Sequence, residues 1–240
     1  GVGCKLDIKG GTDVKWSPTI DYFQNVVLPV FKYLGMECTI DIDKRGYFPR
    51  GGGIVKAYIK PIKKLKTLDL VSRCNSPISG ISICSNLAKS VAERQIRSAN
   101  ELLSEQNVRL SNIVIDIADD ISPGSSITLY SVSKGSFLGA DNVGERGKPA
   151  EKVGKQVAQL FLKEYLSDAP IDVHLGDMIA TPLFLASGES KFKVSTLTPH
   201  IRTNLHVASL FTGRKYYFDM HKNGTSTITI KPDSSNRLAE

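Results

Sequence analysis

The stretch Gly46-Tyr-Phe-Pro-Arg-Gly-Gly-Gly53 constrains this fold more than any other part of the sequence. Consecutive glycines are costly in an ordered chain, because glycine loses more backbone freedom on folding than any other residue. Apolar and polar residues alternate on both sides of the stretch, which predicts a strand over 38–43 and a returning strand over 54–59. The glycines therefore lie at a turn between two strands, where something approaches the backbone closely.

Two well-known glycine motifs are excluded here. The sequence has no G-x-x-x-x-G-K-[ST] phosphate loop, and a strand follows the glycines where a dinucleotide-binding motif needs a helix. A plain hairpin corner is one interpretation. The other is a ligand loop, in which the aromatic pair Tyr47-Phe48 and Pro49 offer flat faces to a base, and Arg50 offers a positive charge to a phosphate.

Charge and cysteine content restrict the class of protein. The formal net charge is +7, which suits nucleic acid or a nucleotide but also fits a merely basic surface. The four cysteines are far apart in the sequence, which indicates reduced thiols and neither a disulfide framework nor a zinc site. The sequence has no apolar run of membrane-spanning length and no signal-peptide pattern. We expect a cytoplasmic protein with no membrane partner.

Periodicity along the chain predicts a mixture of helices and hairpins. A helix is expected to begin at Ser17-Pro18, ahead of the strand, glycine loop and strand. Residues 77–166 have the pattern of a βαββα block. Helices over 173–186 and 199–211 follow, and a hairpin turning at Asn223-Gly224 ends the chain. This succession predicts the α+β class.

Five stretches, in order, resemble the RNA 3′-terminal phosphate cyclase family. One is the glycine stretch itself, with its aromatic pair, proline, variable residue and three glycines. The other four are Gly10-Gly-Thr-Asp13, Val91-Ala-Glu-Arg94, Gly144-Glu-Arg-Gly-Lys-Pro-Ala-Glu151 and His200-Ile-Arg-Thr-Asn204. Their order and rough spacing agree with the family over nearly the whole chain.

The resemblance implies a specific architecture. Family members have a large domain of repeated units, each with two helices and a four-stranded sheet, similar to the C-terminal domain of translation initiation factor 3. A smaller α/β domain is inserted into the last unit. We therefore expect residues 1–76 and 167–240 to form the large domain, and residues 77–166 to form the insert. The glycine-rich beginning of the family pattern, about the first hundred residues, has no counterpart in this sequence. We expect one of three explanations: the first repeat lies on a separate chain, it has been lost, or this chain is a fragment.

The resemblance also implies an enzyme, a ligase that uses ATP. A histidine takes AMP from ATP and passes it to an RNA 3′-phosphate, and the neighbouring 2′-hydroxyl then closes a 2′,3′-cyclic phosphate. The implied cofactors are ATP and a divalent metal, Mg or Mn, and the implied partner is RNA with a 3′-phosphate end. The alternative is a non-catalytic cyclase-like protein that acts in ribosome biogenesis or binds RNA.

Family positions then assign the site. His200 matches the nucleophile, and Thr198-Pro199 predicts a helix start that would place it in a first turn, where the helix dipole attracts phosphate. Asp177 matches a carboxylate expected to orient the imidazole or stabilise its cationic form. His174 falls where a relative has a tyrosine that stacks on adenine.

Pro49 matches the proline on the other face of the base. The predicted ATP-binding residues are Pro49, Arg50, Gly51, Gly52, Gly53, His174 and Asp177. No residue of this chain is predicted to bind the metal, and His206 and His221 are expected to be structural.

Overall fold

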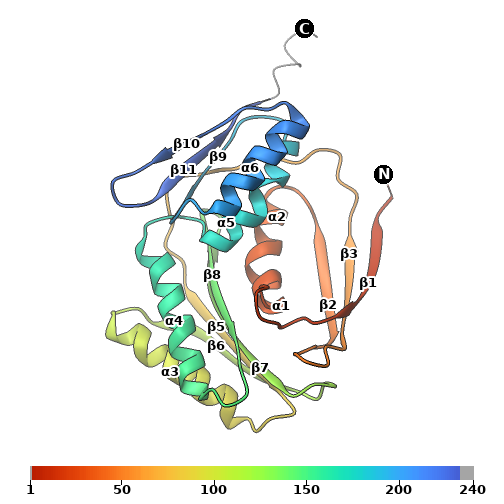
Figure 1. Cartoon of the computed structure of the whole chain (residues 1–240), viewed down its shortest axis with the longest axis vertical. Coiled ribbons are helices and arrows are strands. Elements are labelled where there is room, and N and C mark those ends of the chain that lie inside the picture. The colour runs from red at the N-terminus through yellow and green to blue at the C-terminus, as the bar shows by residue number, and fades with distance from the viewer. Residues whose placement is uncertain (1, 233–240) are drawn as a thin grey trace.

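The computed structural model describes residues 2–232, which form three β-sheets and the helices packed on them (Figure 1). Strands and helices are mixed along the chain, and most strand pairs are antiparallel, so the predicted α+β class is confirmed. In the described part of the chain, no helix is both long enough and apolar enough to cross a membrane.

The first unit is a three-stranded sheet with one helix. Its strands are β1 (Cys4–Gly10), β2 (Cys38–Lys44) and β3 (Gly53–Ile59), and β3 pairs antiparallel with both neighbours. The helix is continuous through α1 (Ile20–Tyr22), a π-helical segment η1 (Phe23–Val27) and α2 (Leu28–Tyr33). The predicted start at Ser17-Pro18 is wrong, because Thr19 is the N-cap and its hydroxyl accepts a hydrogen bond from the Tyr22 N–H.

The second unit contains the C-terminal elements and one short strand from earlier in the chain. Its sheet has the order β10 (Tyr216–Met220), β11 (Ser226–Ile230), β9 (Ser190–Val194) and β4 (Asp69–Leu70). Helices α5 (Val173–Ala180) and α6 (Pro199–Thr212) belong to this unit. The predicted helix over 173–186 is too long, because α5 ends before Pro182, which begins the 3₁₀ turn η2 (Pro182–Leu185).

The two units repeat one pattern. In both, a strand is followed by a helix and an antiparallel hairpin, and the last strand of the hairpin lies in the middle. The sheet order β1-β3-β2 thus corresponds to β9-β11-β10. This correspondence agrees with the expectation of repeated units.

The third sheet is formed by residues between these units. Its order is β6 (Leu110–Ala118), β5 (Ile78–Ser85), β7 (Gly124–Ser133) and β8 (Ser136–Val143). Helices α3 (Ser90–Glu105) and α4 (Ala150–Leu166) pack on one face of it. The predicted βαββα pattern missed β8, because this strand has no regular alternation of β-branched residues and follows β7 after only a two-residue turn.

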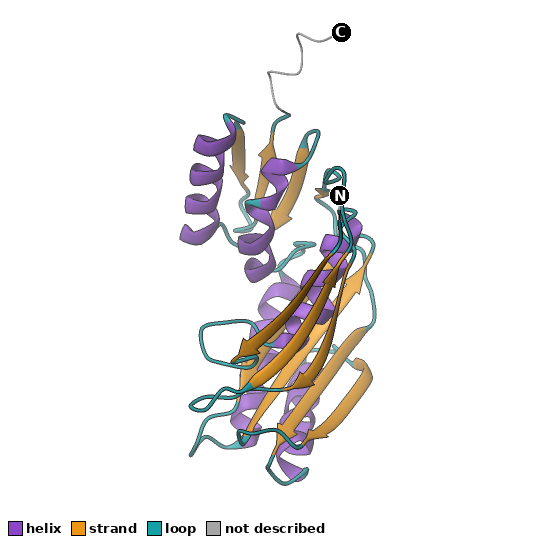
Figure 2. Ribbon diagram, turned by 90° about the vertical axis from the view of Figure 1, so that its right-hand side faces the viewer, coloured by secondary structure: helices purple, strands orange, loops and turns teal. Residues whose placement is uncertain are grey.

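The third sheet also contributes to the core of the other units. Phe137 of β8 is buried in the same cluster as Tyr22 of α1 and Leu175 of α5. Figure 2 shows the sheet that begins at the N-terminus lying across this larger sheet. Residues 77–166 therefore have their own sheet but share a core with the rest of the chain, and the domain boundaries at 77 and 166 stay a prediction.

Candidate active site

His200 lies in the first turn of α6, as its sequence context predicts. Thr198 is the N-cap, and its Oγ1 accepts a hydrogen bond of 2.9 Å from the Ile201 N–H. Pro199 occupies the first helical position, where its missing N–H costs nothing. The His200 side chain is exposed, and no described residue forms a hydrogen bond or ion pair with it. Its ring nitrogens are therefore open to a ligand from solution.

Asp177 connects the two helices beside His200. Its Oδ1 accepts a hydrogen bond of 2.6 Å from Thr198 Oγ1, and its backbone carbonyl accepts one of 2.9 Å from Asn204 Nδ2. The carboxylate thus contacts the N-cap of α6, and in the described chain no hydrogen bond joins it to the imidazole. Asp177 therefore positions the turn that carries His200. Sequence reasoning missed the part that Asn204 plays, although this residue belongs to the stretch His200–Asn204.

The electrostatics of this helix start favour an anion. Unpaired N–H groups and aligned peptide dipoles give the N-terminal end of α6 a partial positive charge. That charge attracts phosphate oxygens. A neutral imidazole beside a phosphate is the arrangement needed for nucleophilic attack at phosphorus.

His174 lies in the first turn of α5, three residues before Asp177 and therefore on the same side of the helix. Its side chain is exposed. The helix start is fixed by Asp172, whose Oδ1 accepts hydrogen bonds from the Leu175 N–H at 2.9 Å and from the Tyr22 hydroxyl at 2.8 Å. Complete burial raises the pKa of Asp172 to about 7. His174 is thus held close to Asp177 on a helix whose first turn is rigidly capped.

The glycine loop is crowded by the protein's own backbone. A Cβ atom on Gly53 would lie 2.8 Å from the carbonyl oxygen of Gly10, and one on Gly46 would also collide with that oxygen. Gly52 has a φ of +81°, and a Cβ there would lie 3.1 Å from Ile121 Cδ1. Close packing against β1 and the segment after β6 therefore accounts for these glycines without a ligand. The assignment of Gly51, Gly52 and Gly53 to ATP stays a prediction.

The aromatic pair before the glycines is split between core and surface. Tyr47 is only 3% exposed, packs against Gly124 and contacts Ser126 Oγ through its hydroxyl at 3.3 Å. The expectation that both aromatic rings offer a face to a base is therefore wrong for Tyr47. Phe48 is 82% exposed, and Pro49 and Arg50 are also at the surface.

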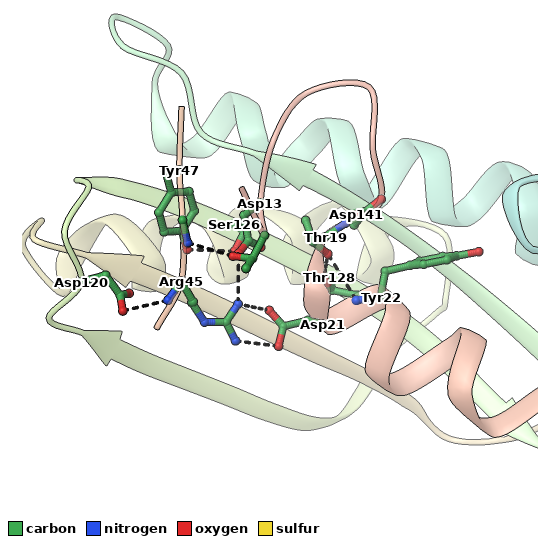
Figure 3. A network of polar contacts seen from close by, with 12 residues as sticks. Asp13, Thr19, Asp21, Tyr22, Arg45, Tyr47, Asp120, Ser126, Thr128 and Asp141 are labelled. Carbon is green, nitrogen blue, oxygen red and sulfur yellow. Dashed lines mark hydrogen bonds and ion pairs between the residues drawn. The ribbon is translucent and has the colours of Figure 1, made fainter. Parts of the chain in front are cut away.

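A buried ionic network lies under the glycine loop (Figure 3). The Arg45 guanidinium binds both carboxylate oxygens of Asp21, at 2.6 and 2.9 Å, and lies 3.4 Å from Asp13. The Arg45 N–H donates to Asp120 at 2.8 Å, which ties the loop to the third sheet. Thr12 accepts from the Gly46 N–H at 2.9 Å and donates to Asp13 at 2.7 Å.

This network holds the start of the glycine loop in place. Burial raises the pKa of Asp13 to about 6, in spite of the opposing charge of Arg45. Sequence reasoning did not identify Arg45, Asp21 or Asp120. The only local signal was the polar pair Thr12-Asp13 after two glycines, because the ion pairs themselves join residues that are far apart in the sequence.

The structure divides the predicted site residues into two groups. His174, Asp177 and His200 lie on the adjacent helices α5 and α6. The loop with Pro49, Arg50 and the three glycines lies at the end of β2 and β3 that points away from these helices (Figure 1). Within residues 2–232, no group of three His, Cys, Asp or Glu side chains is placed to hold a metal ion.

Comparison with known proteins agrees with the motifs. A family model described as RNA 3'-terminal phosphate cyclase matches residues 2–218. A protein with this name from Methanococcoides burtonii is 45% identical over 227 residues, covering 95% of this chain and 66% of the relative. The corresponding protein from Archaeoglobus fulgidus is 37% identical, covering 90% of this chain and 64% of its own length. The protein from Pyrobaculum aerophilum is 38% identical, and the match covers 97% of this chain and 67% of the relative. The chain thus spans about two thirds of the length of these curated relatives.

Proposed function

This chain belongs to the RNA 3′-terminal phosphate cyclase family, and we propose that it carries the nucleophile of an ATP-dependent cyclisation of RNA 3′-phosphate ends. The nucleophile is His200. The observation that supports this role is its location: an exposed imidazole without a partner among the described residues, in the first turn of a helix capped by Thr198. The proposal concerns the complete natural protein, because the activity belongs to the whole enzyme.

In the first step, a ring nitrogen of His200 attacks the α-phosphorus of ATP. A P–N bond forms, the bond from the α-phosphorus to the bridging oxygen breaks, and diphosphate leaves with the electron pair. The positive end of α6 stabilises the negative charge that accumulates on the phosphoryl oxygens. The ring becomes cationic when it is bonded to phosphorus. The carboxylate of Asp177, which is held against Thr198 at 2.6 Å, supplies a negative charge beside the start of α6.

Two displacements complete the reaction. An oxygen of the RNA 3′-phosphate attacks the phosphorus on His200, the P–N bond breaks, and the imidazole regains its lone pair. The terminal phosphate now carries AMP as a leaving group. The 2′-hydroxyl loses its proton and attacks the 3′-phosphorus, AMP departs, and a 2′,3′-cyclic phosphate remains.

The implied divalent metal, Mg or Mn, would neutralise charge on the triphosphate when bound. The described residues do not fit a dedicated metal site, since no cluster of three metal-binding side chains is present among them. We therefore assign no metal ligand in this chain. His174 is proposed as an adenosine contact on the strength of its family position. Pro49 and Arg50 lie on the loop that points away from α5 and α6, so their contact with the same nucleotide stays a prediction.

Covalent labelling tests the role of His200. The complete natural protein is incubated with ATP labelled at the α-phosphate, and the protein is assayed for label that is lost in acid but kept in base, as expected for a phosphoramidate. The His200→Asn variant keeps a side chain of similar polarity but lacks the nucleophilic nitrogen, so its labelling should fall to background. His206→Asn is the matched control, because His206 is also exposed and lies on the same helix.

Product formation tests the rest of the reaction. An RNA ending in a 3′-phosphate should become resistant to phosphatase with wild-type protein and with His206→Asn, and should stay sensitive with His200→Asn. Equal labelling of the two variants would discard His200 as nucleophile. A wild-type protein that takes no label, and leaves the RNA unchanged, would favour the non-catalytic, cyclase-like alternative.

A further inference from the structure

The outer edge of the third sheet is unusually apolar. β6 forms this edge and is nine residues long, with one charged side chain, Asp116. Ile113, Val114 and Ile117 are 49%, 50% and 52% exposed. An edge strand leaves N–H and C=O groups unpaired along one side, and proteins usually protect such an edge with charges, proline or a short strand. β6 has little of this protection.

The edge strand β1 shows the usual protection. It is seven residues long and carries Lys5, Asp7 and Lys9, although it also exposes Leu6 and Ile8. Lysines on an edge oppose pairing with another chain, because pairing would bring their charges together or desolvate them. β6 therefore lacks the lysine side chains that discourage β1 from pairing with another chain.

The order of apolar and polar residues in β6 is nearly the same in both directions from Val114. If two copies pair antiparallel with Val114 opposite Val114, then Ile113 of each copy faces Ile115 of the other, and Asn112 faces Asp116. The amide of Asn112 can then donate to the carboxylate of Asp116, twice in the pair. Moving the twofold axis by one residue, to Ile113 or to Ile115, would instead place Asp116 opposite the apolar Leu110 or Val114.

The two ends of the strand are also complementary. Arg109 precedes β6 and Asp119 follows it; both side chains are exposed, and neither has a hydrogen-bond or ion-pair partner among the described residues. Antiparallel pairing brings the Arg109 end of one copy beside the Asp116–Asp119 end of the other. Opposite charges across a strand pair stabilise it, and like charges destabilise it.

We propose that β6 is a self-association edge, through which two copies of this protein join their third sheets about a twofold axis at Val114. The occupant is a second copy because the strand complements itself: isoleucines and valines meet at the centre, and opposite charges meet at both ends. The inference is independent of the proposed reaction, because β6 contains none of the residues assigned to it.

The first test is the oligomeric state, measured by analytical ultracentrifugation over protein concentrations up to roughly 1 mM, where weak association is still detectable. Wild type should form dimers. Val114→Lys places two positive charges together on the axis and should give monomers, whereas Val114→Thr, which keeps a β-branched side chain, should still dimerise. Leu6→Lys on β1 is the control for association through another edge, and it should leave the dimer intact. Circular dichroism verifies that each variant is folded.

A charge exchange tests the orientation. Arg109→Glu should weaken the dimer about tenfold, because it places like charges at both ends of the strand pair. Adding Asp119→Arg to that variant should restore the affinity. A dimer that responds to neither Val114→Lys nor the charge exchange would overturn the proposal.

Disulfide trapping tests the register. Cβ atoms of directly opposed residues lie about 4.5–5.5 Å apart, so Val114→Cys, in a background with the exposed Cys4 and Cys74 changed to serine, should form a covalent dimer on oxidation. Ile113→Cys, which faces Ile115 in this register, should form it much less readily. A protein that stays monomeric at every concentration, whether or not β6 accepts a strand from a different protein, contradicts the proposal.

Discussion

Thr198 Oγ1 lies 2.6 Å from Asp177 Oδ1, so the residue that caps α6 is held by a carboxylate on α5. The same hydroxyl oxygen accepts the hydrogen bond of the Ile201 N–H at 2.9 Å. His200 lies between these two anchored positions in the sequence. The geometry of the proposed nucleophile therefore depends on a contact between helices as well as on its own helix.

Asp177 variants should separate positioning from charge. Asp177→Ala removes the acceptor for Thr198 and should lower the free energy of unfolding by about 1 kcal/mol, together with a loss of His200 labelling. Asp177→Asn keeps an acceptor oxygen, so urea unfolding should show most of the stability recovered. If the carboxylate charge also stabilises the cationic phosphoramidate, labelling in Asp177→Asn stays low. If Asp177→Asn recovers both the labelling of His200 and the free energy of unfolding, then Asp177 has only a positioning role.

Gly52→Ala should be more damaging than Gly147→Ala. Both glycines have positive φ, +81° and +79°, where an L-residue costs about 1–2 kcal/mol. A new Cβ at Gly52 would also lie 3.1 Å from Ile121 Cδ1, whereas nothing lies within 4 Å of one at Gly147. Thermal unfolding should show the larger loss for Gly52→Ala. ATP affinity, measured on the folded variants, then tests the predicted nucleotide contact: a loss with Gly52→Ala alone supports it, and unchanged affinity opposes it.

Asp13 should make stability depend on pH. Its folded pKa is raised from 3.8 to about 6 by burial, so between these values the folded state binds more protons than the unfolded state. The contribution of Asp13 to stability should therefore be greatest below 3.8 and should fall as pH rises towards 6 and above. Relative to Asp13→Asn, wild type should lose up to roughly 3 kcal/mol over this range, measured by urea unfolding. Parallel pH profiles for the two proteins would refute the shifted pKa.

Arg45→Met should destabilise the protein strongly. It leaves the buried carboxylates of Asp21 and Asp13 without their cation, a change that typically costs about 3–5 kcal/mol. Lys56→Met is the matched control, because the ion pair of Lys56 with Asp43 is partly exposed and should contribute no more than about 1 kcal/mol. Chemical denaturation measures both. Adding Asp21→Asn to Arg45→Met should recover part of the loss, and failure to recover any would assign the effect to packing of the arginine side chain.

Local features of the sequence predicted a large part of this molecule. The start of α6 at Thr198-Pro199 needs only a cap residue and a proline in succession, and the structure confirms it. The strands on both sides of the glycine loop and the C-terminal hairpin follow from alternation over a few residues, which is visible in any short window. The five ordered motifs indicated the family, which the comparisons confirm.

The tertiary structure alone decided which residues meet. Arg45 and Asp21 are both ordinary charged residues in the sequence, and only the packing of β2 against α1 buries them together. Tyr47 and Phe48 are neighbours of similar type, yet one is in the core and the other at the surface, because the loop folds onto β7. Caps and periodicity act over a few residues, so the sequence determines them directly. Burial, pKa shifts and ion pairs depend on contacts between distant segments, and these exist only once the sheets and helices have packed.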